Sequence, residues 1–230
     1  MQLPTSLLHL TYLLTLASAH FELIKPESRG TQYDKLTEYP CGGLPVSSKR
    51  TRVSLMDPEL NVALKMGHDH SAVQVLLAIG PDPGTNFNVT LVPTFMEIGL
   101  GDFCLQDVKL TEEKLGTQLT EGLEATLQVV TNGDPNGGLY NCADLVFTAF
   151  PSDDDDDASC RNGTGVTAKP FPESVGRINA NESTPNGERQ GGSGGRNGGD
   201  QGGENNSAAS LEAAAWGVLG AAVLAAGALL

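Results

Sequence analysis

The sequence predicts an all-β protein, folded as an antiparallel β-sandwich with two disulfides. Three observations support this fold class: apolar side chains recur at every second position in several short segments, turn-forming residues separate those segments, and the chain contains four cysteines. A period of two is typical of strands with one buried face. An even number of cysteines in a secreted chain indicates disulfides.

The strand pattern is clearest at residues 72–79, where Val73, Val75, Leu77 and Ile79 fall on one face. The same pattern and short apolar pieces predict further strands at residues 90–92, 103–105, 123–129 and 139–150. A dense run of turn residues at 132–138 separates the last two. Only residues 111–115 have a helical pattern, with Thr111 as N-cap and two glutamates in the first turn. Short strands joined in this way favour a sandwich.

The composition divides the chain into four parts. Residues 1–19 are apolar and uncharged and end in Ala17-Ser18-Ala19, which predicts a signal peptide. Residues 20–169 have the mixed composition and the size of one domain. Residues 170–206 are rich in Gly, Asn, Ser and charged residues, so we expect a disordered, flexible stalk.

The fourth part, residues 207–230, predicts a propeptide that is removed when a glycosylphosphatidylinositol (GPI) anchor is attached. An apolar run fills residues 213–230, no basic residue follows it, and small residues precede it. The expected attachment residue is Asn206 or Ser207. The alternative is a tail-anchor helix that stays in the membrane. Either way, the expected location is the extracellular face of the cell membrane, reached through the secretory pathway.

The chain is acidic, with 14 basic and 28 acidic residues and a net charge of −14. A charge of this sign argues against nucleic acid or an anionic lipid surface as a partner, and it suits a protein that attracts cations. Four Asn-x-Ser/Thr sequons fit the secretory route and predict glycosylation. They begin at Asn88, Asn162, Asn181 and Asn205.

The four cysteines are Cys41, Cys104, Cys142 and Cys160, and they allow three disulfide connectivities. Cys104 and Cys142 fall in expected strands, so a pair between them across the core is one interpretation. Cys41 and Cys160 would then tie the N-terminal loop to the C-terminal segment. A cysteine zinc site is not expected, because the chain has no C-x-x-C pair.

Cleavage after Ala19 would make His20 the first residue of the mature protein. An N-terminal histidine can chelate one metal ion with its α-amine and its imidazole, and the reference pKa of that amine is about 7.7–8.0. One more imidazole would complete a T-shaped site of three nitrogens. Such a donor set suits Cu(II), which also leads the divalent affinity order.

His68 and His70 are the remaining histidines of the mature chain, and they directly precede an expected strand. In an extended conformation they would share one face, and either could supply the third nitrogen. Two alternatives stay open from the residues alone. They could be exposed loop histidines, or they could bind zinc together.

Several motifs then occur together along the domain. They are His20-Phe21-x-Leu23-x-x-Pro26, Pro40-Cys41-Gly42-Gly43, Gly67-His68, Gly99-x-Gly101-Asp102-Phe103-Cys104-Leu105, and Asn132-Gly133 through Tyr140-x-Cys142-Ala143-Asp144. With them the chain resembles the fungal copper-acquisition proteins related to lytic polysaccharide monooxygenases (LPMOs), which are commonly GPI-anchored.

This resemblance implies an immunoglobulin-like β-sandwich with two disulfides and one copper site, the histidine brace. It implies His20, His68 and Asp144 as copper ligands, with His70 and Asp102 as second candidates. It also implies copper capture at the cell surface for acquisition and homeostasis, with a plasma-membrane copper transporter as a partner.

A copper binder is therefore expected, and not an enzyme. The alternative is an LPMO-type oxidase that acts on cell-wall polysaccharide. The mature chain has no tryptophan, and its tyrosines are Tyr33, Tyr39 and Tyr140. It is thus poorly supplied with the aromatic platforms that a polysaccharide-binding face needs. A metal-free structural adhesin is the third possibility.

Overall fold

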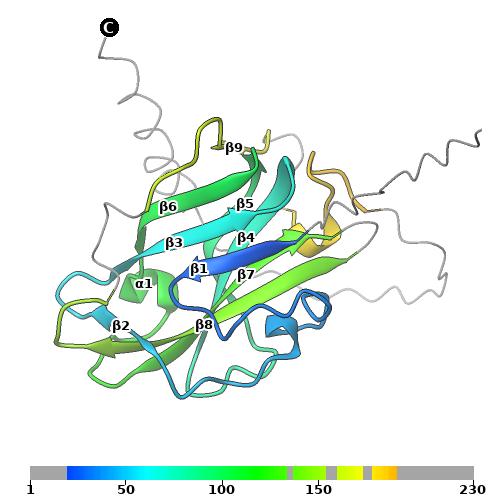
Figure 1. Ribbon diagram of the computed structural model, residues 1–230. Coiled ribbons are helices and arrows are strands. Elements are labelled where there is room, and N and C mark those ends of the chain that lie inside the picture. The colour runs from blue at the N-terminus through cyan, green and yellow to red at the C-terminus, as the bar shows by residue number, and fades with distance from the viewer. Residues whose placement is uncertain (1–19, 134–136, 154–159, 173–177, 191–230) are drawn as a thin grey trace, which may run out of the picture.

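A computed structural model describes residues 20–133, 137–153, 160–172 and 178–190, and this part of the chain is a β-sandwich (Figure 1). The expected signal peptide and the expected GPI attachment site and propeptide lie outside the described residues. The strands of the described part are β1 (Phe21–Lys25), β2 (Thr51–Ser54), β3 (Glu59–Met66), β4 (His70–Ile79), β5 (Val89–Ile98), β6 (Gly101–Lys109), β7 (Glu124–Asn132), β8 (Gly138–Thr148) and β9 (Thr167–Pro170). No helix among these residues is long and apolar enough to cross a membrane.

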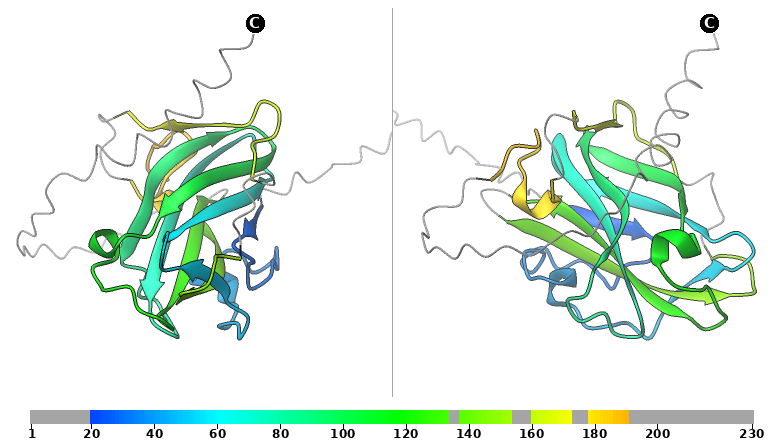
Figure 2. Two further views of the ribbon diagram at one scale, coloured as in Figure 1. Left: turned by 90° about the vertical axis from the view of Figure 1, so that its left-hand side faces the viewer. Right: turned by 180° about the vertical axis from the view of Figure 1, so that it is seen from behind.

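The strands form two sheets that face each other (Figure 2). The smaller sheet has the order β1-β3-β6, and the larger has the order β2-β8-β7-β4-β5-β9. Neighbouring strands are antiparallel except β2 and β8, which are parallel. The predicted all-β sandwich is thereby confirmed.

The core fills the space between the two inner faces. Val73, Val75 and Leu77 of β4 are fully buried in it, as their period of two predicts. Rings from the two sheets meet at Phe95 and Phe103, whose centroids are 5.6 Å apart. Each such apolar side chain contributes about 1.5–3 kcal/mol when it is fully buried.

The five expected strands are all present and are longer than or shifted from their predicted ranges. The one α-helix of the described residues, α1 (Glu112–Leu115), begins where it was expected, because the Thr111 side chain accepts a hydrogen bond from Lys114 N. The unpredicted strands are β1, β2, β3 and β9. Three of them have four or five residues, which is too short for a clear periodic signal.

The predicted cysteine pairing is wrong. The disulfides join Cys41 to Cys142 and Cys104 to Cys160. Cys104 alternates with core residues on β6, so its side chain lies on the outer face of the smaller sheet. Cys142 alternates with core residues on β8 and lies on the outer face of the larger sheet. Two cysteines on opposite outer faces cannot pair across the core.

The domain also runs past the expected boundary at residue 169. Residues 178–190 pack on the outer face of the larger sheet, where Ala180 joins a small apolar cluster with Ala72, Val130 and Tyr140. The Gln190 amide donates to the carbonyl of Gly137 in the turn between β7 and β8. Part of the segment expected to be stalk therefore belongs to the folded domain.

Candidate metal centre

His20 lies at the edge of the smaller sheet, directly before β1. Phe21 pairs with Met66 on β3, and the ladder continues one residue further, because Gly67 donates its backbone N–H to the His20 carbonyl oxygen at 2.9 Å. His20 is therefore held opposite Gly67. The residue that follows Gly67 is His68, so the fold brings these two histidines to adjoining positions from 48 residues apart in the sequence.

The two internal histidines have different surroundings. His68 is half-buried in the turn between β3 and β4, whereas His70 is exposed and is the first residue of β4 in the other sheet. His70 pairs with Ile98 of β5, and its Nδ1 is 3.6 Å from the Asp69 carboxylate. They do not form one extended segment, so the sequence-based idea of a shared face does not hold. The backbone connection favours His68 as the companion of His20.

The imidazole of His20 touches a tyrosine from the loop that follows β1. The ring centroids of His20 and Tyr33 are 5.1 Å apart, with the rings edge to face at 65°. The Tyr33 hydroxyl donates a hydrogen bond to the carboxylate of Glu22. On a strand, residues 20 and 22 project to the same side, so the tyrosine spans both side chains.

A buried carboxyl that was not predicted from the sequence lies close to the turn that holds His68. Glu97 is fully buried on β5, and neither of its carboxyl oxygens has a hydrogen-bond partner among the described residues. Burial raises the pKa of Glu97 to about 8, and the nearby negative charge of Asp69 adds to the shift. An acidic residue two positions after a core phenylalanine was the available signal, because strand alternation aims it inward.

Asp102 does not lie beside His20. It is an exposed residue on β6, paired with Lys65 of β3, and Lys65 is paired in turn with Glu22 of β1. Two strand spacings, about 10 Å, therefore separate the backbone of Asp102 from β1. The structure does not bring this second candidate together with the histidines.

Asp144 lies in a different cluster altogether, and its expected place in the metal site needs correction. Asp144 on β8 pairs with Thr126 on β7, and Thr126 pairs in turn with Ala78 on β4. Asp144 therefore lies level with Ala78, which is eight residues along β4 from His70. Eight strand residues span roughly 26 Å. A carboxylate at that distance cannot share an ion with His68.

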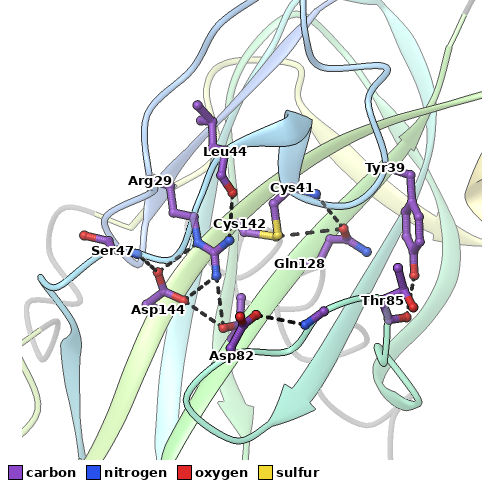
Figure 3. Close-up of a disulfide and its surroundings, with 12 residues drawn as sticks. Arg29, Tyr39, Cys41, Leu44, Ser47, Asp82, Thr85, Gln128, Cys142 and Asp144 are labelled. Carbon is purple, nitrogen blue, oxygen red and sulfur yellow. Dashed lines mark hydrogen bonds and ion pairs between the residues drawn. A yellow bond between two sulfur atoms is a disulfide. The ribbon is translucent and has the colours of Figure 1, made fainter.

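The carboxylate of Asp144 is also fully occupied by other partners (Figure 3). The Arg29 guanidinium donates to both oxygens at 2.8 and 2.7 Å, Ser47 N donates to Oδ2 at 2.8 Å, and the Thr126 hydroxyl donates to Oδ1 at 2.7 Å. Burial alone would raise the pKa of Asp144, but these hydrogen bonds and the Arg29 charge outweigh it and hold the pKa below its usual value. The arrangement is that of a structural ion pair.

The candidate donors that remain are the nitrogens of His20 and His68, whose positions adjoin through the backbone contact of Gly67 with His20. Among the described residues, no three side chains of His, Cys, Asp or Glu gather closely enough to hold a metal ion. A brace made by one terminal amine and two imidazoles needs only two such side chains. The pairing of His20 with Gly67 is compatible with that donor set, and its chemistry suits copper.

Comparison with known proteins identifies related chains. A family model described as "Copper acquisition factor BIM1-like" matches residues 18–165. An uncharacterized protein of Aspergillus fumigatus is 51% identical over 93% of this chain and 95% of its own length. The LPMO-like protein X325 of Yarrowia lipolytica is 33% identical over 82% of this chain and 69% of its own. Copper acquisition factor BIM1 of Cryptococcus neoformans var. neoformans is 29% identical over 60% of this chain and 64% of its own.

Proposed function

The chain belongs to the family of BIM1-like copper acquisition factors, and from this premise we propose that it captures Cu(II) outside the cell through a brace of His20 and His68. The observation that carries the proposal is the hydrogen bond from Gly67 N to the His20 carbonyl at 2.9 Å, which sets the two histidines at adjoining positions. Copper is the cargo here, and the protein's task is to hold it.

Three nitrogens supply the proposed site. Removal of residues 1–19 frees the α-amine of His20, which closes a chelate with the ring of the same residue, and His68 supplies the third donor. Both imidazoles and the amine must be deprotonated to bind, so copper capture releases protons and strengthens as pH rises. Asp144 is not a ligand in this proposal, because Arg29 holds both of its oxygens.

The cell-surface part of the proposal follows from the two ends of the chain. A signal peptide would send the protein into the secretory pathway, and a GPI anchor at Asn206 or Ser207 would keep it on the membrane. A protein fixed there can pass copper to a plasma-membrane copper transporter. The sequons at Asn88 and Asn162 lie at exposed residues, which suits glycosylation.

An LPMO-type oxidase is the second candidate, because relatives of this chain carry the name LPMO-like protein. The surface beside His20 argues for the binder. Tyr33, the aromatic residue next to the candidate site, packs edge to face with His20, and its hydroxyl donates a hydrogen bond to Glu22, so both its ring and its hydroxyl already have partners. Incubation of the copper-loaded protein with reductant, peroxide and chitin or cellulose should yield no oxidised oligosaccharide. Such products would establish the oxidase instead.

The first test is an N-terminal extension. Protein that begins at His20 should bind Cu(II) at least about 10-fold more tightly than protein that begins at Ala19, because the extra residue turns the amine into an amide. Competition with a chromogenic chelator measures both constants. The electron paramagnetic resonance (EPR) spectrum should also lose nitrogen coupling in the extended form. Equal affinities and equal spectra would refute the brace.

The second test separates the internal histidines. His68→Ala should weaken Cu(II) binding at least about 10-fold in protein that begins at His20, since one of three nitrogen donors is lost. His70→Ala is the matched control and should bind like the parent, because His70 starts a strand of the other sheet. The opposite ranking, from the same chelator competition, would transfer the ligand role to His70.

A further inference from the structure

We propose that Tyr33 is a positioning residue for the copper site, which holds the His20 imidazole in its chelating orientation and is itself fixed by Glu22. The inference rests on the proposed function, because the orientation of the His20 ring matters only if that ring binds copper. It assigns a role to a loop residue that supplies no ligand atom.

The geometry of three side chains carries the inference. The ring of Tyr33 meets the ring of His20 edge to face, with centroids 5.1 Å apart. This separation lies in the range in which aromatic pairs attract beyond their burial. The contact comes from the loop after β1, 13 residues along the chain, so the loop closes back over the residue that becomes the N-terminus.

Glu22 fixes the other end of the tyrosine. The Tyr33 hydroxyl donates to a Glu22 carboxylate oxygen, and charged acceptors give the stronger class of hydrogen bond. Glu22 belongs to β1, where it is paired with Lys65 of β3. The phenol is thus held between a strand residue and the histidine, which limits its rotation although 47% of its surface is exposed.

A terminal histidine needs such support more than an internal one. After cleavage, no peptide bond restrains His20 on its N-terminal side, and the hydrogen bond from Gly67 holds its carbonyl but does not set the rotamer of its imidazole. Fixing one rotamer-rich side chain before binding saves about 0.5–1.5 kcal/mol of ordering on association. That range corresponds to about a 2- to 12-fold gain in affinity. Tyr33 would supply this pre-organisation without touching the metal.

Tyr39 offers a matched control within the same loop region. It is exposed to nearly the same extent, 49%, and it also meets an aromatic ring edge to face, that of Tyr140 at 5.0 Å. Its hydroxyl donates to the carbonyl of Thr85. It differs from Tyr33 in lying against Tyr140 and not against His20.

The experiment compares Tyr33→Ala and Tyr39→Ala in protein that begins at His20 and in protein that begins at Ala19. In the His20 form, Tyr33→Ala should lower Cu(II) affinity about 2- to 12-fold and change the copper hyperfine coupling in the EPR spectrum, while Tyr39→Ala should change neither. Tyr33→Phe keeps the ring but loses the bond to Glu22, so it should fall between. In the Ala19 form, Tyr33→Ala should have no effect on affinity.

The outcomes separate this inference from the function on which it depends. If the two parent forms bind copper equally, the brace itself is absent and the proposed function fails. If the parents differ but Tyr33→Ala matches its parent in affinity and EPR spectrum, only the role of Tyr33 is refuted. An equal loss of affinity in both forms would also refute it, because the effect would then not depend on the terminal chelate.

Discussion

Asp144→Ala is expected to lower the free energy of unfolding by about 3–5 kcal/mol, because it leaves the charge of Arg29 buried without its partner. The side chain of Arg29 is 4% exposed and that of Asp144 is fully buried. The variant would also strip Ser47 N and the Thr126 hydroxyl of their acceptor. Urea unfolding of the mature domain with its disulfides intact measures the change.

An exposed ion pair in the same domain gives the control. Arg52 and Asp153 also form a close pair, but their side chains are 50% and 37% exposed. Asp153→Ala should lower the unfolding free energy by less than about 1 kcal/mol, because solvent screens such pairs. If the two variants lose the same stability, burial is not what makes the Asp144 pair important.

The same ion pair has a defined pH dependence. The pKa of Asp144 is depressed in the fold, so its contribution to the free energy of unfolding is fully present above the unfolded pKa of about 3.9 and is lost as pH falls through the lower folded value.

The Asp144→Asn variant, measured under conditions where it is folded, should bind copper as the parent does. A large loss of copper affinity in folded Asp144→Asn would return this residue to the ligand set.

The parts of the fold that the sequence predicts are those that depend on neighbours along the chain. Alternation on β4 and β7 identifies buried faces, and the Thr111 cap identifies α1, because each needs only a few adjacent residues. Predicting the disulfide pairing requires more than adjacent residues. Whether Cys104 faces Cys142 depends on which sheet each strand joins, and that is a property of the whole topology.

The candidate site divides in the same way. His20 and His68 were predicted as candidates from a cleavage motif and from a resemblance, and the structure adds the backbone contact through Gly67. Asp144 also belongs to a motif of the resemblance, which implied that it binds copper. Its partner in the structure is Arg29, 115 residues away, and the local sequence gives no sign of that pairing. The contact of Tyr33 with His20 is made only in the folded chain, so spacing and composition do not reveal it, whereas strand alternation from Phe95 could have indicated that Glu97 faces inward.

Glu97 gives the second large effect. Its folded pKa of about 8 lies well above the value of about 4.3 expected in the unfolded chain, so between these pH values the folded state keeps a proton that the unfolded state releases. The unfolding free energy of the parent should therefore fall by up to about 4 kcal/mol as pH rises from about 4.5 to 8. Below that window the carboxyl is neutral in both states and costs nothing through ionisation.

Glu97→Gln removes this ionisation and should flatten the pH dependence. The free energy of unfolding of the variant should match that of the parent within about 1 kcal/mol at pH 4.5 and exceed it by several kcal/mol at pH 9. At pH 9 only the parent must either ionise a buried carboxyl or keep it protonated at a pH above its pKa. Urea unfolding across this pH range measures both curves. Glu113→Gln, at an exposed position on α1, is the control and should keep the parent's slope. If Glu97→Gln keeps that slope too, the charge that destabilises the domain at high pH lies at another residue.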